Sequence, residues 1–168
     1  MTVIMNRRSV RDFKEEGLDE GALDQLVHAG MAAPTAKNMQ PWSFIVVEQR
    51  ETLDRLAGGL PFGKMLGKAA AAIVVCTSPE EANGQSVELA VIDATCASQN
   101  ILLAAEALGL GAVWVAAYPY EDRMEHLRSV LQVPHTVIPL CVIPLGRPVV
   151  SKPPIDKFKP EKIHRERW

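Results

Sequence analysis

Residues 87–108 read VELAVIDATCASQNILLAAEAL and form the longest helical pattern in a chain of 168 residues. One apolar stripe holds Leu89, Ile92, Cys96, Leu103 and Ala107, and much of the remaining surface holds Val91, Ala94, Ile101, Leu102 and Ala105. A helix that is apolar nearly all round must be covered all round. One sheet covers one face, so we expect the other face to meet the same helix of a second copy. The alternative is a central helix wrapped by its own chain.

The remaining periodicity predicts a small sheet with helices around it. Four apolar runs are typical of strands, and they lie at residues 42–47, 69–76, 111–117 and 137–143. Three amphipathic patterns predict helices between Asp19 and Pro34, at residues 51–57 and at residues 121–131. The nearly continuous apolar character of residues 42–47 predicts burial on both faces. Without a regular βαβ repeat, these elements predict an α+β fold of three layers around a mostly antiparallel sheet, in one domain over residues 1–168.

Charge is distributed unevenly along the chain. The net charge of −2, with 48% hydrophobic and 23% charged residues, gives no reason to expect nucleic-acid binding. Residues 147–168 carry seven Lys or Arg against three Asp or Glu, and they contain four prolines. Such a tail cannot form a core of its own. We expect it to dock on an acidic protein surface or an anionic ligand, unless it is a solvated tail.

The sequence predicts a cytoplasmic protein without a membrane partner. No apolar segment follows the N-terminal arginines as in a signal peptide, and no uninterrupted apolar run approaches the ~20 residues that span a membrane. The three cysteines and four histidines are scattered, without the spacing of a disulfide framework or a zinc site. We therefore predict reduced thiols and no metal centre.

The first candidate binding motif is Arg7-Arg8-Ser9-Val10-Arg11. If it is extended, Arg7, Ser9 and Arg11 point to one side; if it is helical, Arg7 and Arg11 still share a face. Either conformation presents guanidinium groups suited to bidentate contacts with phosphate oxygens. The alternative is a solvated basic surface interleaved with the acidic residues that follow it.

The second candidate motif is the run APTAKNMQPW at residues 33–42. Its small residues lead directly into a predicted strand, so that backbone donors and Asn38 can approach a planar polar ligand closely. The alternative is a plain helix-to-strand connection in which Asn38 caps a turn. The first motif is suited to a phosphate group, and the second is suited to a planar polar ligand. Together they suggest a phosphorylated cofactor with a planar ring system.

These two motifs resemble those of the nitroreductase-like flavoprotein family, and the resemblance spans nearly the whole chain. It continues in order through ALGLGAVW at residues 107–114, VIPLGRP at 142–148 and IHRERW at 163–168. It implies a three-layer nitroreductase-like fold and a homodimer that binds FMN at the subunit interface. It also implies that the C-terminal tail is domain-swapped and crosses to the partner subunit.

The resemblance also implies which residues contact FMN. The phosphate and ribityl chain would be held by Arg7, Arg8, Ser9 and Arg11, with further cations at Arg147 and Lys157. The flavin ring would be contacted from the opposite subunit by Pro34, Thr35, Ala36, Asn38 and Gln40. Lys64 would face the ring, and a backbone N–H from Val115, Ala116 or Ala117 would reach flavin N5. Arg11 would also place a fixed positive charge near the N1/O2 edge, which favours the reduced ring. Lys64 is equally consistent with an ordinary loop lysine, and Gln40 with support of the loop from behind.

The implied activity is that of an FMN-dependent oxidoreductase. It would take hydride from NADH or NADPH and pass it to a nitroaromatic, quinone or related acceptor by a ping-pong mechanism. The absence of a catalytic triad, paired catalytic carboxylates or a Walker motif agrees with chemistry carried by a cofactor. The alternatives are another reaction of the same superfamily, such as enone reduction or reductive dehalogenation, and a low-turnover flavin carrier or sensor.

Overall fold

A computed structural model describes residues 1–150 and 153–168. The helices are α1 (Thr2–Asn6), α2 (Ala22–Met31), α3 (Arg50–Gly59), α4 (Val87–Ala107) and α5 (Glu121–Leu131). The strands are β1 (Trp42–Val47), β2 (Ala71–Thr77), β3 (Gly111–Ala112), β4 (Val115–Ala116) and β5 (Ile138–Gly146). Short 3-10 turns connect them, among them η1 (Ala36–Asn38), η2 (Lys64–Lys68) and η5 (Pro160–Lys162).

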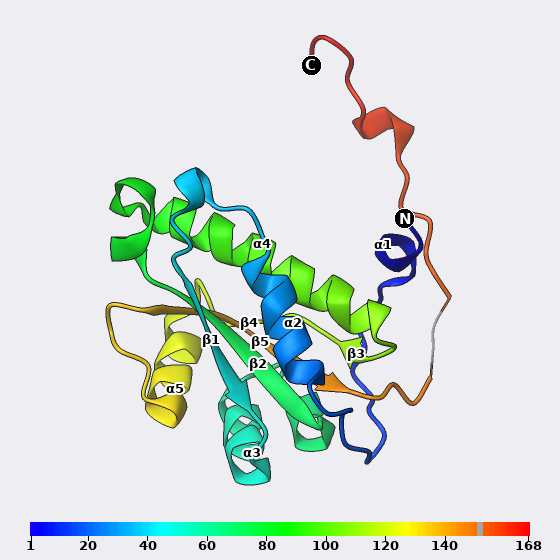
Figure 1. Ribbon diagram of the computed structural model, residues 1–168, viewed down its shortest axis with the longest axis vertical. Coiled ribbons are helices and arrows are strands. Elements are labelled where there is room, and N and C mark those ends of the chain that lie inside the picture. The colour runs from blue at the N-terminus through cyan, green and yellow to red at the C-terminus, as the bar shows by residue number, and fades with distance from the viewer. Residues whose placement is uncertain (151–152) are drawn as a thin grey trace.

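The five strands form one sheet in the order β1-β2-β5-β3, and β4 also pairs with β5. Every pairing between these strands is antiparallel, which confirms the predicted strand direction. Helices α2 and α4 cover one face of the sheet, while α3 and α5 cover the other (Figure 1). The predicted three-layer α+β arrangement is therefore confirmed.

Strand β2 lies at the centre of this arrangement, and all seven of its residues are buried. Ala72, Val74 and Cys76 belong to the cluster that contains the apolar side chains of α3 and α5. Ile73 and Val75 belong to the cluster that contains those of α2 and α4. Successive strand residues point to opposite faces, so a strand covered on both sides is apolar throughout.

Helix α4 begins and ends within one residue of its predicted bounds. Ser86 caps it, because its Oγ accepts a hydrogen bond from the Leu89 N–H at 3.2 Å. The buried face is rich in alanine, which brings the helix close to the sheet, and it contains Ala90, Ala94, Ala97, Ile101 and Ala105. The opposite stripe is covered only in part by this chain, since Ile92 is 56% exposed while Leu89, Cys96 and Leu103 are half-buried. Around Ile92 the helix is therefore not wrapped by its own chain, as the alternative required.

By length and composition alone, α4 is also apolar enough to cross a membrane. The core helix of a protein without any membrane segment meets the same criterion, and α4 packs along the sheet (Figure 1). The packing of its inner face against the sheet therefore explains the apolar residues on that face.

Two predictions about strands were wrong. Strand β1 is not buried on both faces, since Ser43 and Val46 are exposed, the latter by 40%. It lies at the edge of the sheet, where the helical layers cover it only in part. The strand predicted at residues 111–117 is divided into β3 and β4, although both keep one register with β5. In that register Val113 lies opposite Pro144, which has no N–H to donate, so the ladder is interrupted there.

The N-terminal segment packs against the end of the sheet. Ser9 forms a bridge with Ala112, and the Val10 N–H donates to the Ala112 carbonyl at 2.9 Å. Val10 occupies the space over Gly111, where an added Cβ would lie 2.7 Å from the Val10 Cγ1. Gly111 therefore allows the segment of the first motif to approach β3.

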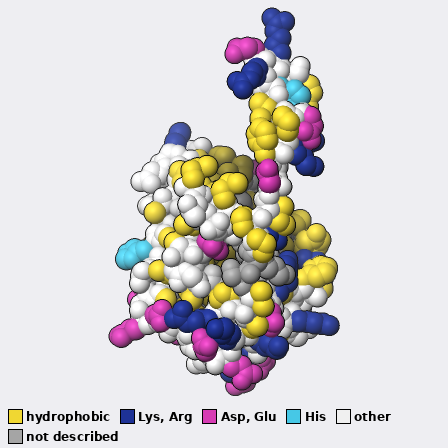
Figure 2. All heavy atoms as spheres, turned by 90° about the vertical axis from the view of Figure 1, so that its right-hand side faces the viewer, with side chains coloured by type: hydrophobic (Ala, Val, Ile, Leu, Met, Phe, Trp, Pro, Cys, Tyr) yellow, Lys and Arg dark blue, Asp and Glu magenta, His cyan; other side chains and the backbone are white. Residues whose placement is uncertain are grey.

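After β5, residues 147–149 still pair with the N-terminal segment, because the Lys14 N–H donates to the Arg147 carbonyl and the Val149 N–H to the Asp12 carbonyl. Residues 153–168 are exposed, and η5 is the helical turn that they contain (Figure 1). The exposed tail carries large hydrophobic side chains, namely Ile155, Phe158, Ile163 and Trp168 (Figure 2). This agrees with the expectation that the tail has no core of its own. Residues 151–152 of the predicted tail lie outside the described residues.

The close approach at Gly111 gives a prediction about stability. We expect Gly111→Ala to lower the free energy of unfolding by about 1–3 kcal/mol, because the new methyl group forces Val10 away from the sheet. The matched control is Gly58→Ala in α3, where a Cβ meets nothing within 4 Å. That change should leave stability unchanged or raise it by up to about 1 kcal/mol. Chemical denaturation measures both, and equal effects would contradict the proposed packing.

Candidate functional site

The first motif is extended, which is one of the two conformations that the sequence left open. Val10 points inward and packs against the core, whereas Ser9 and Arg11 on either side of it are exposed. Arg7 stands at the end of α1 with extended backbone angles of −51° and 125°. The alternation therefore places Arg7, Ser9 and Arg11 on the outward side of the segment.

Three predicted cations meet in one groove, although they come from opposite ends of the chain. Arg7 and Arg8 line it from the N-terminal side, and Lys157 lines it from the tail. The Arg8 guanidinium also donates to the Pro153 carbonyl, which joins the two segments. Asp156 is among the lining residues, so cations outnumber carboxylates there. This groove is suited to a phosphate group. Ser9 and Arg11 line a second, neighbouring hollow.

Arg147 is not brought to this groove. Its Nη2 lies 2.6 Å from the Asp19 Oδ1, and its Nε lies 3.8 Å from the Glu16 Oε2. Because two carboxylates already neutralise the guanidinium, a phosphate would have to compete with both. The structure thus gives Arg147 the role of fastening the end of β5 to the acidic segment before α2.

Lys64 is exposed at the start of η2. At the other end of this turn, the Lys68 Nζ lies 3.6 Å from the Oδ1 of Asp12, the residue after Arg11. The turn therefore lies alongside the motif, and Lys64 is available to a ligand bound there.

The second motif forms a loop with unusual backbone angles. Lys37, Asn38 and Gln40 have φ values of 52°, 57° and 55°, in the left-handed region that non-glycine residues seldom occupy. The loop is closed on itself, because the Gln40 N–H donates to the Thr35 Oγ1 at 3.1 Å and the Asn38 N–H to the Thr35 carbonyl. Asn38 and Gln40 present their side chains to solvent. Such strain persists only where the surroundings hold it, and it is common at binding sites.

Asp93 of α4 is a site residue that the sequence reasoning missed. It is only 3% exposed, and its Oδ1 accepts a hydrogen bond from the Ala36 N–H at 3.1 Å. Thr77 assists from β2, because its hydroxyl donates to the Pro41 carbonyl at 3.1 Å. A lone carboxylate in an otherwise apolar stretch of helix was the available signal, since a buried charge needs a donor. Asp93 and Thr77 together hold the loop in its strained form.

The two motifs lie at opposite ends of α4 within one subunit. The loop is held beside Asp93 near the start of the helix, whereas the first motif lies beside Ala112, beyond its end (Figure 1). The helical stretch between them is roughly 20 Å long at 1.5 Å per residue. One subunit therefore does not bring the phosphate groove and the loop together.

Strand β4 presents one backbone N–H away from the sheet. The Ala117 N–H donates to the Leu140 carbonyl, and the Ala116 carbonyl instead accepts from Arg123. Antiparallel pairing alternates, so residue 116 directs both of its backbone groups away from β5. Among Val115, Ala116 and Ala117, the Ala116 N–H is thus the donor placed to meet a ligand.

The buried thiols are unreactive near neutral pH. Burial raises the pKa of the Cys76 thiol to about 12, and burial likewise raises the pKa of the Cys141 thiol to about 12. Both therefore stay protonated near neutral pH and are poor nucleophiles. They serve as small apolar side chains in the two core clusters.

Comparison with known proteins agrees with this geometry. The Nitroreductase family model matches residues 4–60 and 58–147. An Archaeoglobus fulgidus protein, provisionally named an NADH dehydrogenase/NAD(P)H nitroreductase, is 40% identical over 171 residues, covering 100% of this chain and 98% of its own. A crystal structure from Parabacteroides distasonis, of a protein with the same provisional name, is 44% identical with a TM-score of 0.93, covering 99% of this chain and 97% of its own.

A further solved structure contains a ligand. It is a nitroreductase, provisionally so named, from Desulfovibrio desulfuricans in complex with FMN. It is 26% identical to this chain with a TM-score of 0.83, covering 99% of this chain and 96% of its own. The matches extend over the first motif, the loop and the core strands alike. The chain therefore belongs to the Nitroreductase family.

Proposed function

We propose that this protein is an FMN-dependent oxidoreductase that takes hydride from NADH or NADPH and passes it to a nitroaromatic, quinone or related acceptor. Family membership supports the class of reaction, and the groove shared by Arg7, Arg8 and Lys157 supports a phosphorylated cofactor. Donor and acceptor would bind in turn at one site, which gives ping-pong kinetics. We place the protein in the cytoplasm, where its three free cysteines stay reduced.

The residues present fit FMN. Arg7, Arg8 and Lys157 would hold its phosphate, and the exposed hydroxyl of Ser9 lies on the same segment for the ribityl chain. When bound, FMN supplies hydride transfer at its N5 atom. The Arg11 guanidinium adds a fixed positive charge on the outward side of the segment. Such a charge favours the negatively charged reduced flavin and so raises its reduction potential.

We infer that the complete site is built by two subunits. The two motifs lie at opposite ends of α4, and the outer stripe of α4, with Ile92 56% exposed, is free to meet a second copy. If two copies of α4 pack in opposite directions about a two-fold axis, each loop approaches the first motif of the other subunit. This pairing supports two equivalent FMN sites at the interface, each with Asn38 from one chain and Arg11 from the other.

We propose further that the tail crosses to the partner subunit. Its hydrophobic side chains beyond the phosphate groove, Ile163 and Trp168, are exposed in the single chain. An apolar groove lined by Trp42 and Phe44, between α2 and the edge strand β1, offers cover for such side chains. Burial of this apolar surface on dimerisation would stabilise both elements.

The cofactor proposal predicts a preference for FMN over riboflavin. We expect purified protein to hold FMN noncovalently and to lose its visible absorbance when NADH or NADPH is added without oxygen. The double change Arg7→Ala and Arg11→Ala should weaken FMN binding at least about tenfold, because it removes charge-assisted contacts that are worth ~1.5–3 kcal/mol each. Titration followed by flavin fluorescence measures this.

The control for that experiment is Arg55→Ala, which removes an exposed arginine elsewhere on the molecule. It should bind FMN like the parent protein. Equal affinity of the parent for riboflavin and FMN would contradict the phosphate groove. If NADH bleaches the flavin but no acceptor restores its colour quickly, the protein is a carrier or sensor instead.

The two-subunit proposal predicts different effects for two isoleucines of α4. Ile92→Glu should convert a dimer into folded monomers with little FMN, because the charge would be buried at the interface. Ile101→Glu should instead unfold the subunit, since Ile101 is fully buried within it. Analytical ultracentrifugation and circular dichroism separate the two outcomes. A parent protein that sediments as a flavin-loaded monomer at low micromolar concentration would refute the dimer.

A further inference from the structure

Arg123, in the first turn of α5, forms a cluster with two exposed aromatic residues. Its guanidinium carbon lies 3.8 Å from the centroid of the Tyr120 ring and 5.7 Å from that of Phe62. Phe62 is 70% exposed and Tyr120 is 48% exposed. We call these three residues the aromatic–arginine cluster. Stacking of this kind fixes the plane of the guanidinium and leaves its N–H edge to make polar contacts.

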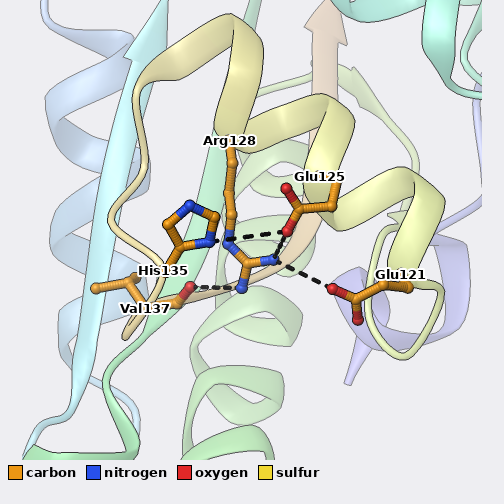
Figure 3. A network of polar contacts seen from close by, with 5 residues as sticks. All are labelled: Glu121, Glu125, Arg128, His135 and Val137. Carbon is orange, nitrogen blue, oxygen red and sulfur yellow. Dashed lines mark hydrogen bonds and ion pairs between the residues drawn. The ribbon is translucent and has the colours of Figure 1, made fainter.

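Among the described residues, Arg123 differs from two other arginines in having no carboxylate partner. Arg128, one turn further along α5, contacts Glu121 and Glu125 and donates to the Val137 carbonyl (Figure 3). Arg147 is paired with carboxylates in the same way. For Arg123, in contrast, no carboxylate lies within 4 Å in the parts of the chain that the structure describes.

One polar atom of Arg123 also lacks a partner. Its Nη1 donates to the Ala116 carbonyl at 3.2 Å, but its Nε is buried without a hydrogen bond in the described chain. A partly buried cation without a counter-ion is costly, because desolvation is not offset by a nearby negative charge. An anionic ligand beside the cluster would supply that charge.

The cluster joins two segments already placed at the site. Arg123 contacts Ala116, whose N–H points away from the sheet, and Phe62 precedes Lys64 by two residues. A ligand on the cluster would therefore lie between strand β4 and the turn that carries Lys64. This is the neighbourhood in which the proposed function requires the electron acceptor.

We propose that the aromatic–arginine cluster binds the electron acceptor and selects planar aromatic compounds that carry a carboxylate. The guanidinium would donate to the carboxylate, while Phe62 and Tyr120 would cover the aromatic ring. This proposal rests on the proposed function. For a nitroaromatic acid, the reaction consumes NAD(P)H and one proton and yields the nitroso acid, NAD(P)⁺ and water. Nitro nitrogen is reduced by two electrons, and one N–O bond is broken.

Two nitroaromatic acceptors of similar size that differ in charge test this selection. We would measure steady-state reduction of 4-nitrobenzoate and of neutral 4-nitrobenzyl alcohol by the FMN-loaded dimer. The variants are Arg123→Gln, Arg123→Lys and Phe62→Ala, with Arg55→Gln as a surface control. FMN content and the rate of flavin reduction by NADH are recorded for each variant. These two readouts test the proposed function separately from the choice of acceptor.

Arg123→Gln should lower kcat/KM for 4-nitrobenzoate at least about tenfold, mainly by raising KM, because one charge-assisted contact is lost. For the neutral alcohol the change should stay within about twofold, since that substrate makes no ionic contact. Arg123→Lys should recover part of the kcat/KM for 4-nitrobenzoate, because it keeps the positive charge but not the planar guanidinium group. Phe62→Ala should lower kcat/KM for both acceptors, and Arg55→Gln should change kcat/KM for neither.

A different pattern overturns the proposal. If Arg123→Gln slows both acceptors equally, Arg123 only supports strand β4 through the Ala116 carbonyl. If neither acceptor is affected, the cluster is not part of the acceptor site. Calorimetric binding of benzoate, which cannot be reduced, gives a second test that does not depend on turnover. The parent should bind benzoate at least about tenfold more tightly than Arg123→Gln, and equal affinity would refute the site.

Discussion

Helix α4 is apolar on more of its surface than one chain can cover, and the rest of the arrangement depends on this constraint. The alanine-rich face lets the helix pack closely on β2 and β5, which fixes the layers of the fold. The outer stripe around Ile92 is left exposed in the single chain. Because the strained loop is fastened to one end of the helix and the first motif lies beyond the other, pairing of two helices would also assemble the cofactor site.

The periodicity of the sequence was sufficient to predict most elements. Strand β1 and helix α5 have the bounds that were predicted, and α4 is within one residue of them. These segments are governed by local pattern, because their apolar residues recur with the period of the element that buries them. The extended form of the first motif could not be decided from sequence, since both conformations place arginines on one face. The contact of Val10 with β3 decides it.

Other features depend on what lies opposite a residue in space. The interruption between β3 and β4 follows from Pro144 across the sheet, which residues 111–117 do not reveal. Arg147 was expected near the phosphate from the family resemblance, and its pairing with Asp19 appears only in three dimensions. Asp93 and Arg123 were overlooked because neither belongs to a motif. Each is recognised by an unusual environment, a buried carboxylate in one case and an unpaired guanidinium in the other.

One FMN site would need residues from two subunits, and complementation between two impaired variants tests this sharing. Arg11→Ala and Asn38→Ala would be co-expressed with different affinity tags, and mixed dimers would be isolated by both tags. If the site is shared, one of the two sites in a mixed dimer carries both changes and the other carries neither. A shared site predicts about half of the parental activity and one tightly bound FMN per mixed dimer. Activity no higher than that of the two separate variants would contradict it.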